Sequence, residues 1–351
     1  MASFGVAIIG SGLFVKEEQL PAAVSCPLID VKAIWSRSAR SAGEAAKLIP
    51  HQSAPVEVYA CDAGPDKSFD DLLARADITG MIITLPIVDQ PSYIEKALAA
   101  GKHVLAVKPI AKDVATAVKL ISYYKEVSAE TKATLAIAEN FRYQPGWGYG
   151  AEEIRKLGNV TGFVVRLNSM MSTSNKYYKT PWRATPEYQG GFLFDGGVHF
   201  TCALRQLLGP QHAVESVIAQ TSLISKHLVP KDTVNAILRT KSGAVGSYIH
   251  SVGTTMNAFE FHIACEQGFI KAERDRVITI RGVGENATTT EKVFERTSGV
   301  KEEMDDWAKA VVSGEPHARH TPEMALGDLE LVEKMLTSGD QSGTMQILEH
   351  Q

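Results

Sequence analysis

The sequence predicts a doubly wound α/β N-terminal domain followed by a C-terminal α+β domain with a large, mostly antiparallel open sheet. A chain of 351 residues is too long for one ordinary core. Up to about residue 140, short apolar runs alternate with longer amphipathic ones, as in a parallel sheet covered by helices. Beyond that point, strand-like runs follow one another with few helices between them. We therefore expect domains at residues 1–140 and 141–351.

Buried strands are expected where Val, Ile, Leu and Ala run almost continuously, because a sheet covered on both faces buries every residue. These runs are GVAII (5–9), VKAIW (31–35), GMIIT (80–84), HVLAV (103–107) and TLAIA (134–138). Helical spacing marks SFDDLLARA (68–76), QPSYIEKALAAG (90–101) and DVATAVKLISYYKEV (113–127). The first and last of these begin with an N-capping residue, Ser68 and Asp113. The alternation of strand and helix predicts the doubly wound fold.

The second domain is expected to hold one broad sheet between Val160 and Ile280. Its strand-like runs are VTGFVVRLNSM (160–170), TVNAILRT (233–240), GAVGSYIHSV (243–252) and AFEFHIACE (258–266). An open sheet face is often covered by a partner, so we expect a homodimer or homotetramer formed through this sheet. Thr321 as N-cap and Pro322 at the first helical position predict a C-terminal helix that packs back on the body.

Composition excludes several function classes. With 36 basic and 40 acidic residues, the formal net charge of -4 offers no basic face for nucleic acid. The N-terminus has no signal-peptide pattern and no apolar run approaches about eighteen residues, so we expect a cytoplasmic protein without a membrane partner. The cysteines show no CxxC spacing and are expected to be buried, reduced thiols. The histidines show no metal-ligand spacing, so no metal is expected.

A glycine pair lies directly after the first predicted strand. Gly10 and Gly12 form a GxG turn, and Leu13 and Phe14 begin the following helix. Such a turn directs backbone N–H groups and a helix N-terminus at a pyrophosphate, which predicts dinucleotide binding. The usual third glycine is replaced by Val15, so the alternative is an ordinary strand-to-helix turn.

The end of the second strand indicates which dinucleotide is bound. An NAD site normally places a carboxylate there to bind the adenosine ribose, whereas this chain has Ser36, Arg37 and Ser38, with Arg40 close behind. Hydroxyl donors and a guanidinium suit a 2'-phosphate. We therefore expect NADP(H) in preference to NAD(H), the alternative being a solvated loop arginine.

Lys108 and Pro109 follow the fifth predicted strand, at the carboxyl edge where wound sheets bind ligands. Thr84 and Pro86 end another strand and are assigned, with Lys108 and Pro109, to the cofactor-facing edge. The peptide bond before Pro109 can be cis or trans, and the sequence does not decide between them. The alternative is a surface lysine whose ammonium group reaches solvent.

Asp195 and His199 are four residues apart in GGFLFDGGVHF (190–200), so on a helix they share one face. The surrounding glycines leave room for a ligand or another backbone. The helix is expected to end at Gly209. The alternative is a core helix capped by Asp195, with His199 as an ordinary packed histidine.

These motifs resemble, in order and spacing, the Gfo/Idh/MocA family of nicotinamide-dependent oxidoreductases. GxG at the N-terminus, VKPIAKD (107–113) and GGFLFDGGVH (190–199) carry the resemblance, and TPWRATPEYQGGFLFDGGVH (180–199) looks most like an NADP-dependent branch found in fungi. The resemblance implies a Rossmann-type first domain and makes Lys108, Asp195 and His199 the catalytic group. Two departures are Val107, where the family usually has Glu, and the missing acidic residue after the histidine.

The expected function is NAD(P)-dependent dehydrogenation or reduction at a CH–OH centre of a sugar, polyol or related small carbonyl or alcohol. His199 is expected to transfer the proton while Lys108 binds the substrate oxygen, with Asp195 orienting one of them. Lys108 as the acid/base is the alternative assignment, and the sequence cannot choose between them.

Supporting substrate contacts are expected from residues of two segments: Asn140, Arg142 and Tyr143 in ENFRYQP, and Trp182 and Arg183 in TPWRATPE. Aromatic faces beside polar donors suit sugars, although Trp182 can equally be a packing residue. Two rival functions keep the same fold. One is a non-catalytic, dinucleotide-sensing regulator; the other is a reductase of an imine or of a secondary-metabolite carbonyl.

Overall fold

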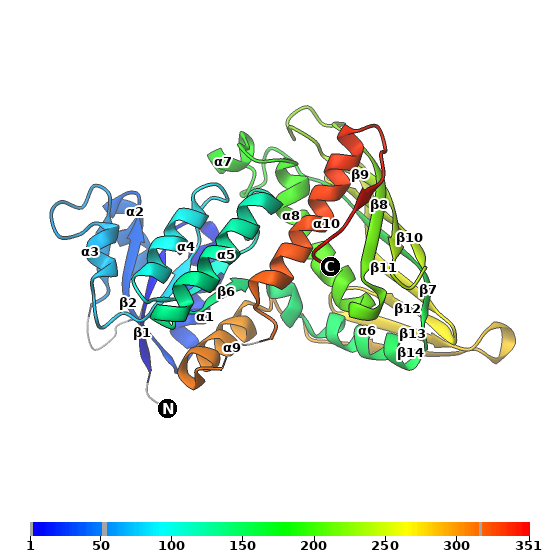
Figure 1. Ribbon diagram of the computed structural model, residues 1–351, viewed down its shortest axis with the longest axis horizontal. Helices are drawn as coiled ribbons and strands as arrows, with labels where there is room; N and C mark the ends of the chain where they lie inside the picture. The colour runs from blue at the N-terminus through cyan, green and yellow to red at the C-terminus, as the bar shows by residue number, and fades with distance from the viewer. Residues whose placement is uncertain (1–2, 51–54, 316–317) are drawn as a thin grey trace. The chain divides into compact units, whose positions relative to one another are not determined.

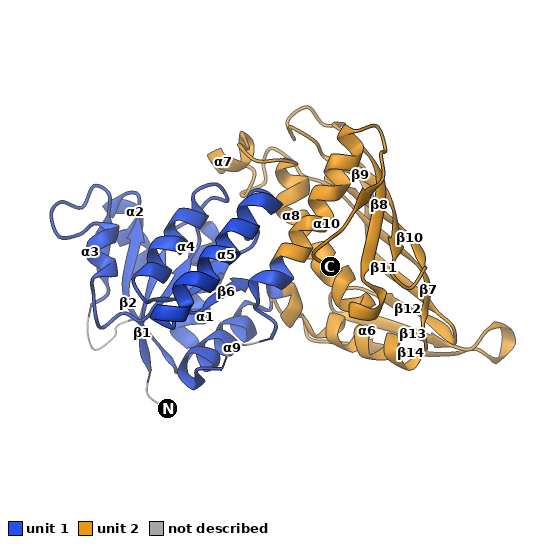
Figure 2. Ribbon diagram, in the orientation of Figure 1, with its two compact units in different colours: residues 1–140, 299–325 blue, residues 141–298, 326–351 orange. Residues whose placement is uncertain are grey.

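The structure, a computed structural model, describes residues 3–50, 55–315 and 318–351. The chain forms two compact units, coloured separately in Figure 2. The first contains residues 1–140 and 299–325, and the second contains residues 141–298 and 326–351. The chain thus returns to the first unit after residue 298, which the expected division into 1–140 and 141–351 does not include.

In the described part of the chain, the first unit is built on a six-stranded parallel sheet with the order β3-β2-β1-β4-β5-β6 (Figure 1). The strands are β1 (Phe4–Ile9), β2 (Ile29–Ser36), β3 (Glu57–Ala60), β4 (Gly80–Ile83), β5 (His103–Val107) and β6 (Leu135–Ala138). Chain order reverses between β1 and β4, and such a reversal opens a crevice at the carboxyl ends of the strands. The predicted doubly wound fold is confirmed.

Helices connect these strands and bury their apolar faces. They are the π-helix η1 (Val15–Gln19), α1 (Leu20–Ser25), α2 (Ala39–Ala46), α3 (Phe69–Leu73), α4 (Gln90–Ala99) and α5 (Val114–Thr131). Both predicted N-caps are confirmed: Ser68 forms a capping box with Asp71, and Asp113 accepts a 2.7 Å hydrogen bond from the Thr116 N–H. Residues Val6 to Ile9 of β1 are completely buried, as expected for a central strand covered on both faces.

Helix α9 (Val300–Ser313) is the part of the C-terminal half that belongs to the first unit. Its Trp307 is 1% exposed and packs edge-on against Phe4, with ring centroids 5.7 Å apart. A Cβ atom at Gly80 would lie 3.1 Å from the Trp307 ring, so β4 needs a glycine there. Burying a ring of this size contributes several kcal/mol, which explains why α9 joins this unit.

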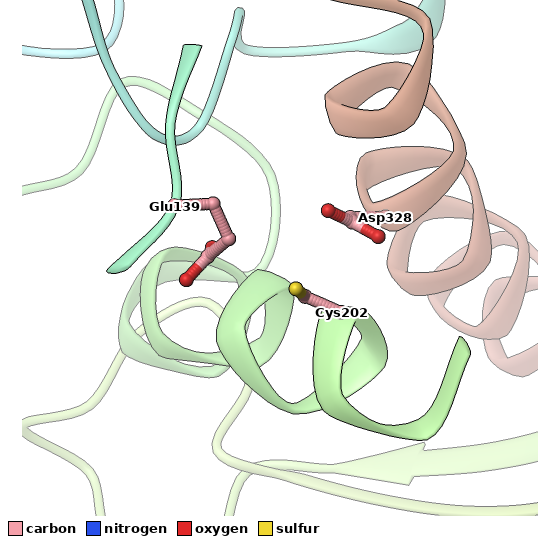
Figure 3. Close-up of side chains that lie close together, drawn as sticks. All are labelled: Glu139, Cys202 and Asp328. Carbon is pink, nitrogen blue, oxygen red and sulfur yellow. The ribbon is translucent and has the colours of Figure 1, made fainter. Parts of the chain in front are cut away.

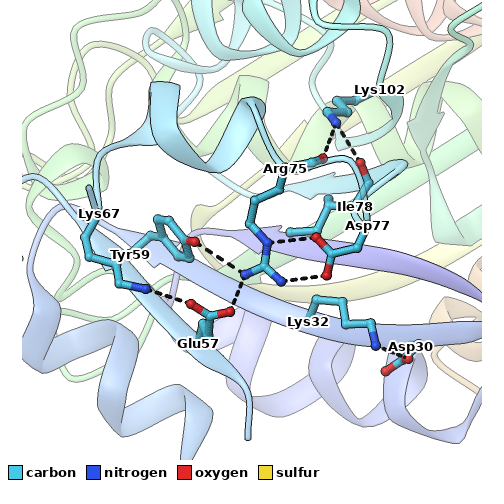
Figure 4. A network of polar contacts seen from close by, with 9 residues as sticks. All are labelled: Asp30, Lys32, Glu57, Tyr59, Lys67, Arg75, Asp77, Ile78 and Lys102. Atoms are coloured by element: carbon cyan, nitrogen blue, oxygen red, sulfur yellow. Dashed lines mark hydrogen bonds and ion pairs between the residues drawn. The ribbon is translucent and has the colours of Figure 1, made fainter. Parts of the chain in front are cut away.

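A polar network links the edge strand β3 to the loop before β4 (Figure 4). The Arg75 guanidinium donates 2.7 Å hydrogen bonds to Glu57 and to Asp77, and Lys67 donates to the other Glu57 oxygen at 2.7 Å. The hydrogen bond from Arg75 is the main cause of the lowered pKa of Asp77. Lys102 is 7% exposed and donates to the carbonyls of Arg75 and Ile78, and burial lowers its pKa. This network fixes the loop that precedes β4.

The second unit is built on a nine-stranded sheet, counted over the described residues, with the order β14-β13-β12-β11-β7-β10-β9-β8-β15. The strands are β7 (Val160–Met170), β8 (Val214–Ser222), β9 (Thr233–Thr240), β10 (Val245–Ser251), β11 (Gly253–Cys265), β12 (Gly268–Ala272), β13 (Arg276–Arg281), β14 (Thr288–Val293) and β15 (Gln346–Ile347). β7 and β10 pair in parallel, and the other neighbours are antiparallel. The predicted large, mostly antiparallel sheet is confirmed.

Helices of the second unit cover one face of this sheet. The main ones are α6 (Pro145–Lys156), α8 (Gly191–Leu208) and α10 (Pro322–Asp340), which belongs to this unit from Leu326 onward. The other helical segments are η2 (Asn140–Tyr143), α7 (Pro181–Ala184), η3 (Pro210–His212) and η4 (Gly284–Asn286). Trp147 of α6 packs on Phe261 of β11 with centroids 4.9 Å apart. The Met324 N–H donates to the Thr321 hydroxyl at 3.3 Å, as the predicted N-cap requires. α8 ends at Gly209, whose φ of 72° confirms the predicted C-terminal glycine.

The opposite face of the sheet carries an apolar row that crosses neighbouring strands. Ile218 pairs with Ile237, Ile237 with Ser247, and Ser247 with Val164. Ile218, Ile237 and Val164 are 47%, 50% and 42% exposed, and Val245 beside them is 48% exposed. Contiguous exposed apolar side chains on a sheet face are typical of interaction surfaces. We refer to these four residues as the open-face patch.

Cys26, Cys61, Cys202 and Cys265 are all free thiols. Three are buried as expected, but Cys61 is exposed because it follows β3 in the turn after the strand ends. Within the described ranges, no helix combines the length and the apolarity needed to cross a lipid bilayer.

Candidate active site

The GxG turn lies at the carboxyl end of β1, as predicted. Gly10 has a φ of 118°, and a Cβ atom there would lie 2.2 Å from the Thr84 carbonyl oxygen, so only glycine fits. A Cβ atom at Gly12 would meet nothing within 4 Å, so the space above this residue is open. Leu13 and Phe14 are half-buried at the start of the helix that continues into η1. The turn therefore presents an open backbone surface suited to a pyrophosphate.

The end of β2 joins this turn through hydroxyl groups. The Ser11 hydroxyl donates to Ser36 at 2.8 Å and lies 2.6 Å from the Ser41 hydroxyl. Arg37 is exposed and forms no ion pair with any described residue. Ser38 is the N-cap of α2, accepting from the Ser41 N–H at 3.3 Å. The Ser36 and Ser41 hydroxyls therefore lie beside the turn, and the exposed Arg37 directly follows Ser36 in the chain.

Two neighbours modify the charge at this end of α2. Arg40 is paired with Glu44 at 3.2 Å, so it is directed along its own helix. Asp62 accepts a 2.6 Å hydrogen bond from the Ala39 N–H, which brings a carboxylate to the helix N-terminus. Arg37 thus remains the main cation available to a ligand phosphate, with one nearby negative charge opposing it.

Thr84 and Pro86 follow β4. The Thr84 N–H donates to the Ile9 carbonyl at 2.8 Å, and its hydroxyl donates to the buried Gln19 side chain. The Pro86 carbonyl accepts a 3.1 Å hydrogen bond from the N–H of Gln90, the first residue of α4. Thr84 therefore lies directly against Gly10, between β1 and β4, where the strand order of the sheet reverses. Dinucleotide cofactors bind at this position in folds of this class.

Lys108 directly follows β5 and precedes a cis peptide bond to Pro109, which answers the question that the sequence left open. The buried Gln90 side chain donates to the carbonyls of Val107 and Pro109 at 2.6 and 3.2 Å. The Lys108 N–H donates to the Ala138 carbonyl at 3.1 Å. The backbone on both sides of Lys108 is thus fixed, and the lysine is half-buried at the carboxyl edge of the sheet.

Asp195 and His199 both lie on α8, so the predicted shared helix face is confirmed. Asp195 is 6% exposed and is the fifth residue of α8, which excludes the helix-capping alternative. Its Oδ2 accepts a 2.8 Å hydrogen bond from Arg183 Nε. The Arg183 guanidinium also lies 4.0 Å from the Trp182 ring centroid. Three predicted residues of the second unit, Trp182, Arg183 and Asp195, are therefore in contact.

His199 is half-buried and stacks on Phe141, with centroids 4.6 Å apart and planes 15° apart. Phe200 and Trp147 also contact Phe141, at 6.0 and 6.2 Å. Arg274 lies 5.3 Å from the same ring. An imidazole held this way keeps one ring orientation, which a proton-transfer group needs.

The segment ENFRYQP contains residues predicted to contact the substrate and an arginine that forms a buried ion pair. Asn140 is half-buried and Tyr143 is 7% exposed, both in η2. Arg142 forms a buried ion pair with Asp328, whose other oxygen pairs with Arg205. Figure 3 shows Asp328 on α10 facing Cys202 on α8. Cys202 Sγ lies within 4.8 Å of an Asp328 carboxylate oxygen. Two guanidinium groups already neutralise Asp328, so this acidic position is a structural ion-pair centre.

Two family models together cover most of the chain. The model described as the oxidoreductase family's NAD-binding Rossmann fold matches residues 4–132, and the one described as its C-terminal alpha/beta domain matches residues 151–347. The chain belongs to the Gfo/Idh/MocA oxidoreductase family. It is therefore a dehydrogenase or reductase with an NAD(P)-binding Rossmann domain, as the resemblance of its motifs implied.

Individual relatives agree with this assignment. Dehydrogenase FPY6 of Fusarium mangiferae is 36% identical over 351 residues, covering 98% of this chain and 99% of that protein. The dTDP-3,4-didehydro-2,6-dideoxy-alpha-D-glucose 3-reductase of Actinomadura kijaniata is 27% identical over 347 residues, covering 95% and 94%. A crystal structure of an oxidoreductase from Thermotoga maritima superposes with a TM-score of 0.84 at 30% identity, covering 98% of each chain. The expected similarity to a fungal member is confirmed by the first of these.

The two units hold different parts of the predicted site. Lys108 and the cofactor-facing residues belong to the first, whereas Asp195, His199, Trp182 and Arg183 belong to the second. The meeting of Lys108 with Asp195 and His199 therefore stays a prediction. Sequence reasoning missed the pairing of Arg183 with Asp195, and it did not single out Tyr188 in the same loop. The only available signal was the density of aromatic and cationic residues in residues 177–188.

Proposed function

We propose that this protein is an NADP(H)-dependent oxidoreductase that moves a hydride between the nicotinamide and a carbon–oxygen centre of a sugar, polyol or related small alcohol or carbonyl. The observation that carries the proposal is the buried Asp195 one helical turn before His199 on α8, in a member of this oxidoreductase family. A carboxylate and an imidazole on one helix face are suited to a proton-transfer pair.

The roles divide as follows. The bound nicotinamide cofactor supplies or accepts the hydride. His199, oriented by its stack on Phe141, transfers the hydroxyl proton, and Lys108 donates a hydrogen bond to the substrate oxygen where negative charge develops. Asp195 pairs with Arg183 and orients its neighbours. Lys108 as the acid/base is the alternative, and a pH profile of turnover for His199→Asn separates the two.

Preference for NADP(H) is supported by the end of β2. Ser36 and the exposed Arg37 stand where an NAD site needs a carboxylate, and Ser11 ties Ser36 to the glycine turn. We expect Arg37→Ala to weaken NADPH binding roughly tenfold or more while leaving NADH binding nearly unchanged. Titration of cofactor fluorescence measures both, with Arg40→Ala as the matched control because Arg40 is paired with Glu44. Equal losses for the two cofactors would contradict the assignment.

A sugar or polyol is supported by the donors and aromatic rings of the second unit. Trp182 offers a ring beside Arg183, and Asn140 and Tyr143 add polar groups. The Actinomadura relative named above acts, by its name, on a nucleotide-linked deoxysugar. The chemistry of the site together with the family supports this substrate class.

The deciding experiment mixes purified protein with NADP(H) or NAD(H) and a panel of aldoses, polyols, their keto forms, imines and non-sugar carbonyls, and follows nicotinamide absorbance. Reduction of NADP that is lost in Lys108→Met would support the dehydrogenase. Tight NADPH binding without turnover of any substrate would instead favour a non-catalytic, dinucleotide-sensing regulator. Turnover only with imines or non-sugar carbonyls would identify the protein as a reductase of an imine or of a secondary-metabolite carbonyl.

We also propose that two copies associate through the open-face patch, in a reducing cytoplasm where the exposed Cys61 thiol stays free. Ile237→Lys places a charge at the centre of the patch and should lower the mass measured by light scattering. Lys241→Glu, an exposed change in the turn after β9, is the control. An unchanged mass in both would contradict this surface as the interface.

A further inference from the structure

An irregular segment joins α7 to α8 (Figure 1). Tyr188 belongs to this segment. It is 7% exposed, and its ring packs against Trp182 and Phe194 with centroids 5.9 and 6.0 Å apart. Its hydroxyl is buried and has no hydrogen-bond partner among the described residues. Buried hydroxyls are normally paired, so this one calls for an explanation.

The charges around Tyr188 determine what its hydroxyl can do. Burial is the main cause that raises its pKa, the negative charge of Asp195 raises it further, and Arg183 acts in the opposite sense. The hydroxyl therefore stays protonated at neutral pH and acts as a donor. Its missing partner is an acceptor, and the Asp195 carboxylate, whose charge acts on Tyr188, makes the surroundings of that partner negative.

One common ligand group suits both the Tyr188 donor and a neighbouring carboxylate. An alcohol hydroxyl can accept a hydrogen bond from Tyr188 and at the same time donate one to a carboxylate. A carboxylate ligand would be repelled by Asp195, and an apolar ligand would leave the Tyr188 hydroxyl unpaired. The tyrosine oxygen is covered in this structure, so binding a ligand there requires the irregular segment 185–189 to shift.

We propose that Tyr188 is a further substrate-binding residue, whose hydroxyl donates a hydrogen bond to one hydroxyl oxygen of a sugar or polyol held beside Asp195. This inference rests on the proposed function and adds a residue and a ligand group to the same site. Tyr188 recognises the substrate and does not transfer the reacting proton. Its loss therefore lowers substrate selectivity and kcat/KM but leaves cofactor binding intact.

The chain offers a matched control in Tyr248 of β10. It is 0% exposed, and its hydroxyl also has no hydrogen-bond partner among the residues described. Burial alone raises its pKa, without a contribution from a charged neighbour. Tyr248→Phe therefore removes a buried, unpaired hydroxyl from the same unit without touching the Asp195 site.

The experiment compares wild type, Tyr188→Phe and Tyr248→Phe with the sugar of the panel that turns over fastest and with its monodeoxy analogues. Thermal unfolding and NADPH binding are measured for all three proteins. We expect Tyr188→Phe to lose roughly tenfold in kcat/KM, equivalent to about 1.4 kcal/mol, with unchanged NADPH affinity. Tyr248→Phe should match wild type. With the one deoxy analogue that lacks the bonded hydroxyl, wild type and Tyr188→Phe should become equal.

The other outcomes overturn the inference in distinguishable ways. If Tyr188→Phe turns over like Tyr248→Phe, or loses the same factor on every deoxy analogue, its hydroxyl does not bind the substrate. If Tyr188→Phe alone fails to fold, the hydroxyl has a structural role. If wild type itself turns over no sugar or polyol, the proposed function fails and this inference fails with it.

Discussion

The Arg183–Asp195 pair makes a quantitative prediction about the second unit. Asp195 is 6% exposed, and the Arg183 side chain is 18% exposed and also stacked on Trp182. Removing one partner of a buried ion pair costs about 3–5 kcal/mol, and the partial exposure of Arg183 places this pair near the lower end of that range. We therefore expect Arg183→Gln to lower the free energy of unfolding by about 3 kcal/mol.

The assay for this prediction is thermal unfolding beside an exposed control. For a domain of 150–250 residues, about 3 kcal/mol corresponds to a fall in Tm of roughly 6–12 °C. The control is the exposed ion pair between Arg239 of β9 and Glu215 of β8, which are 3.0 Å apart with side chains 59% and 41% exposed. Because exposed pairs contribute little, Arg239→Gln should change Tm by only about 0–3 °C. Adding Asp195→Asn to Arg183→Gln should recover part of the Tm but no activity. A fall no larger than that of Arg239→Gln would refute the reasoning.

Three further predictions concern other parts of the molecule. Gly10→Ala should abolish detectable NADPH binding in a fluorescence titration, because its Cβ atom would lie 2.2 Å from the Thr84 carbonyl oxygen; normal affinity would contradict the assigned turn. Trp307→Ala should destabilise the first unit by about 3–5 kcal/mol in urea unfolding, since the ring is 1% exposed. Burial lowers the pKa of His250 to about 3, so the unfolded chain binds its proton first and stability falls as pH falls below about 6.5. When the pH is lowered from about 7.5 to about 5, the free energy of unfolding of wild type should therefore fall by about 2 kcal/mol more than that of His250→Asn. Equal falls in the two proteins would contradict a buried, neutral imidazole at position 250.

Helices and strands could be predicted from the sequence where a single physical requirement, such as complete burial or helical spacing, determines the residue pattern. The buried strands β1, β2, β4, β5 and β6 were predictable because complete burial demands continuous apolar runs. α8 was predictable because spacing places Asp195 and His199 on one face and Gly209 ends the helix. The strand β3 was missed because EVYA is four residues long and pairs only at the sheet edge.

Other features depend on contacts that local sequence does not encode. The return of α9 to the first unit rests on Trp307 packing against Phe4, residues far apart in the chain. The strand β14 is exposed along its whole length, so it carries no hydrophobic pattern to detect. The Arg183–Asp195 pair and the unpaired Tyr188 hydroxyl likewise emerge only when the loop before α8 is folded. Their chemistry was visible in the sequence, but their proximity was not.

The central claim, hydride transfer to a sugar carbon, is tested most directly by following the hydride itself. NADPH carrying deuterium on one or the other face of C4 is incubated with the protein and the ketosugar that the panel identifies, and the product is analysed by mass spectrometry. We predict one deuterium in the product from only one of the two labelled cofactors, and none with Lys108→Met. Tight binding of NADPH with no deuterium in the product from either labelled cofactor would contradict the claim.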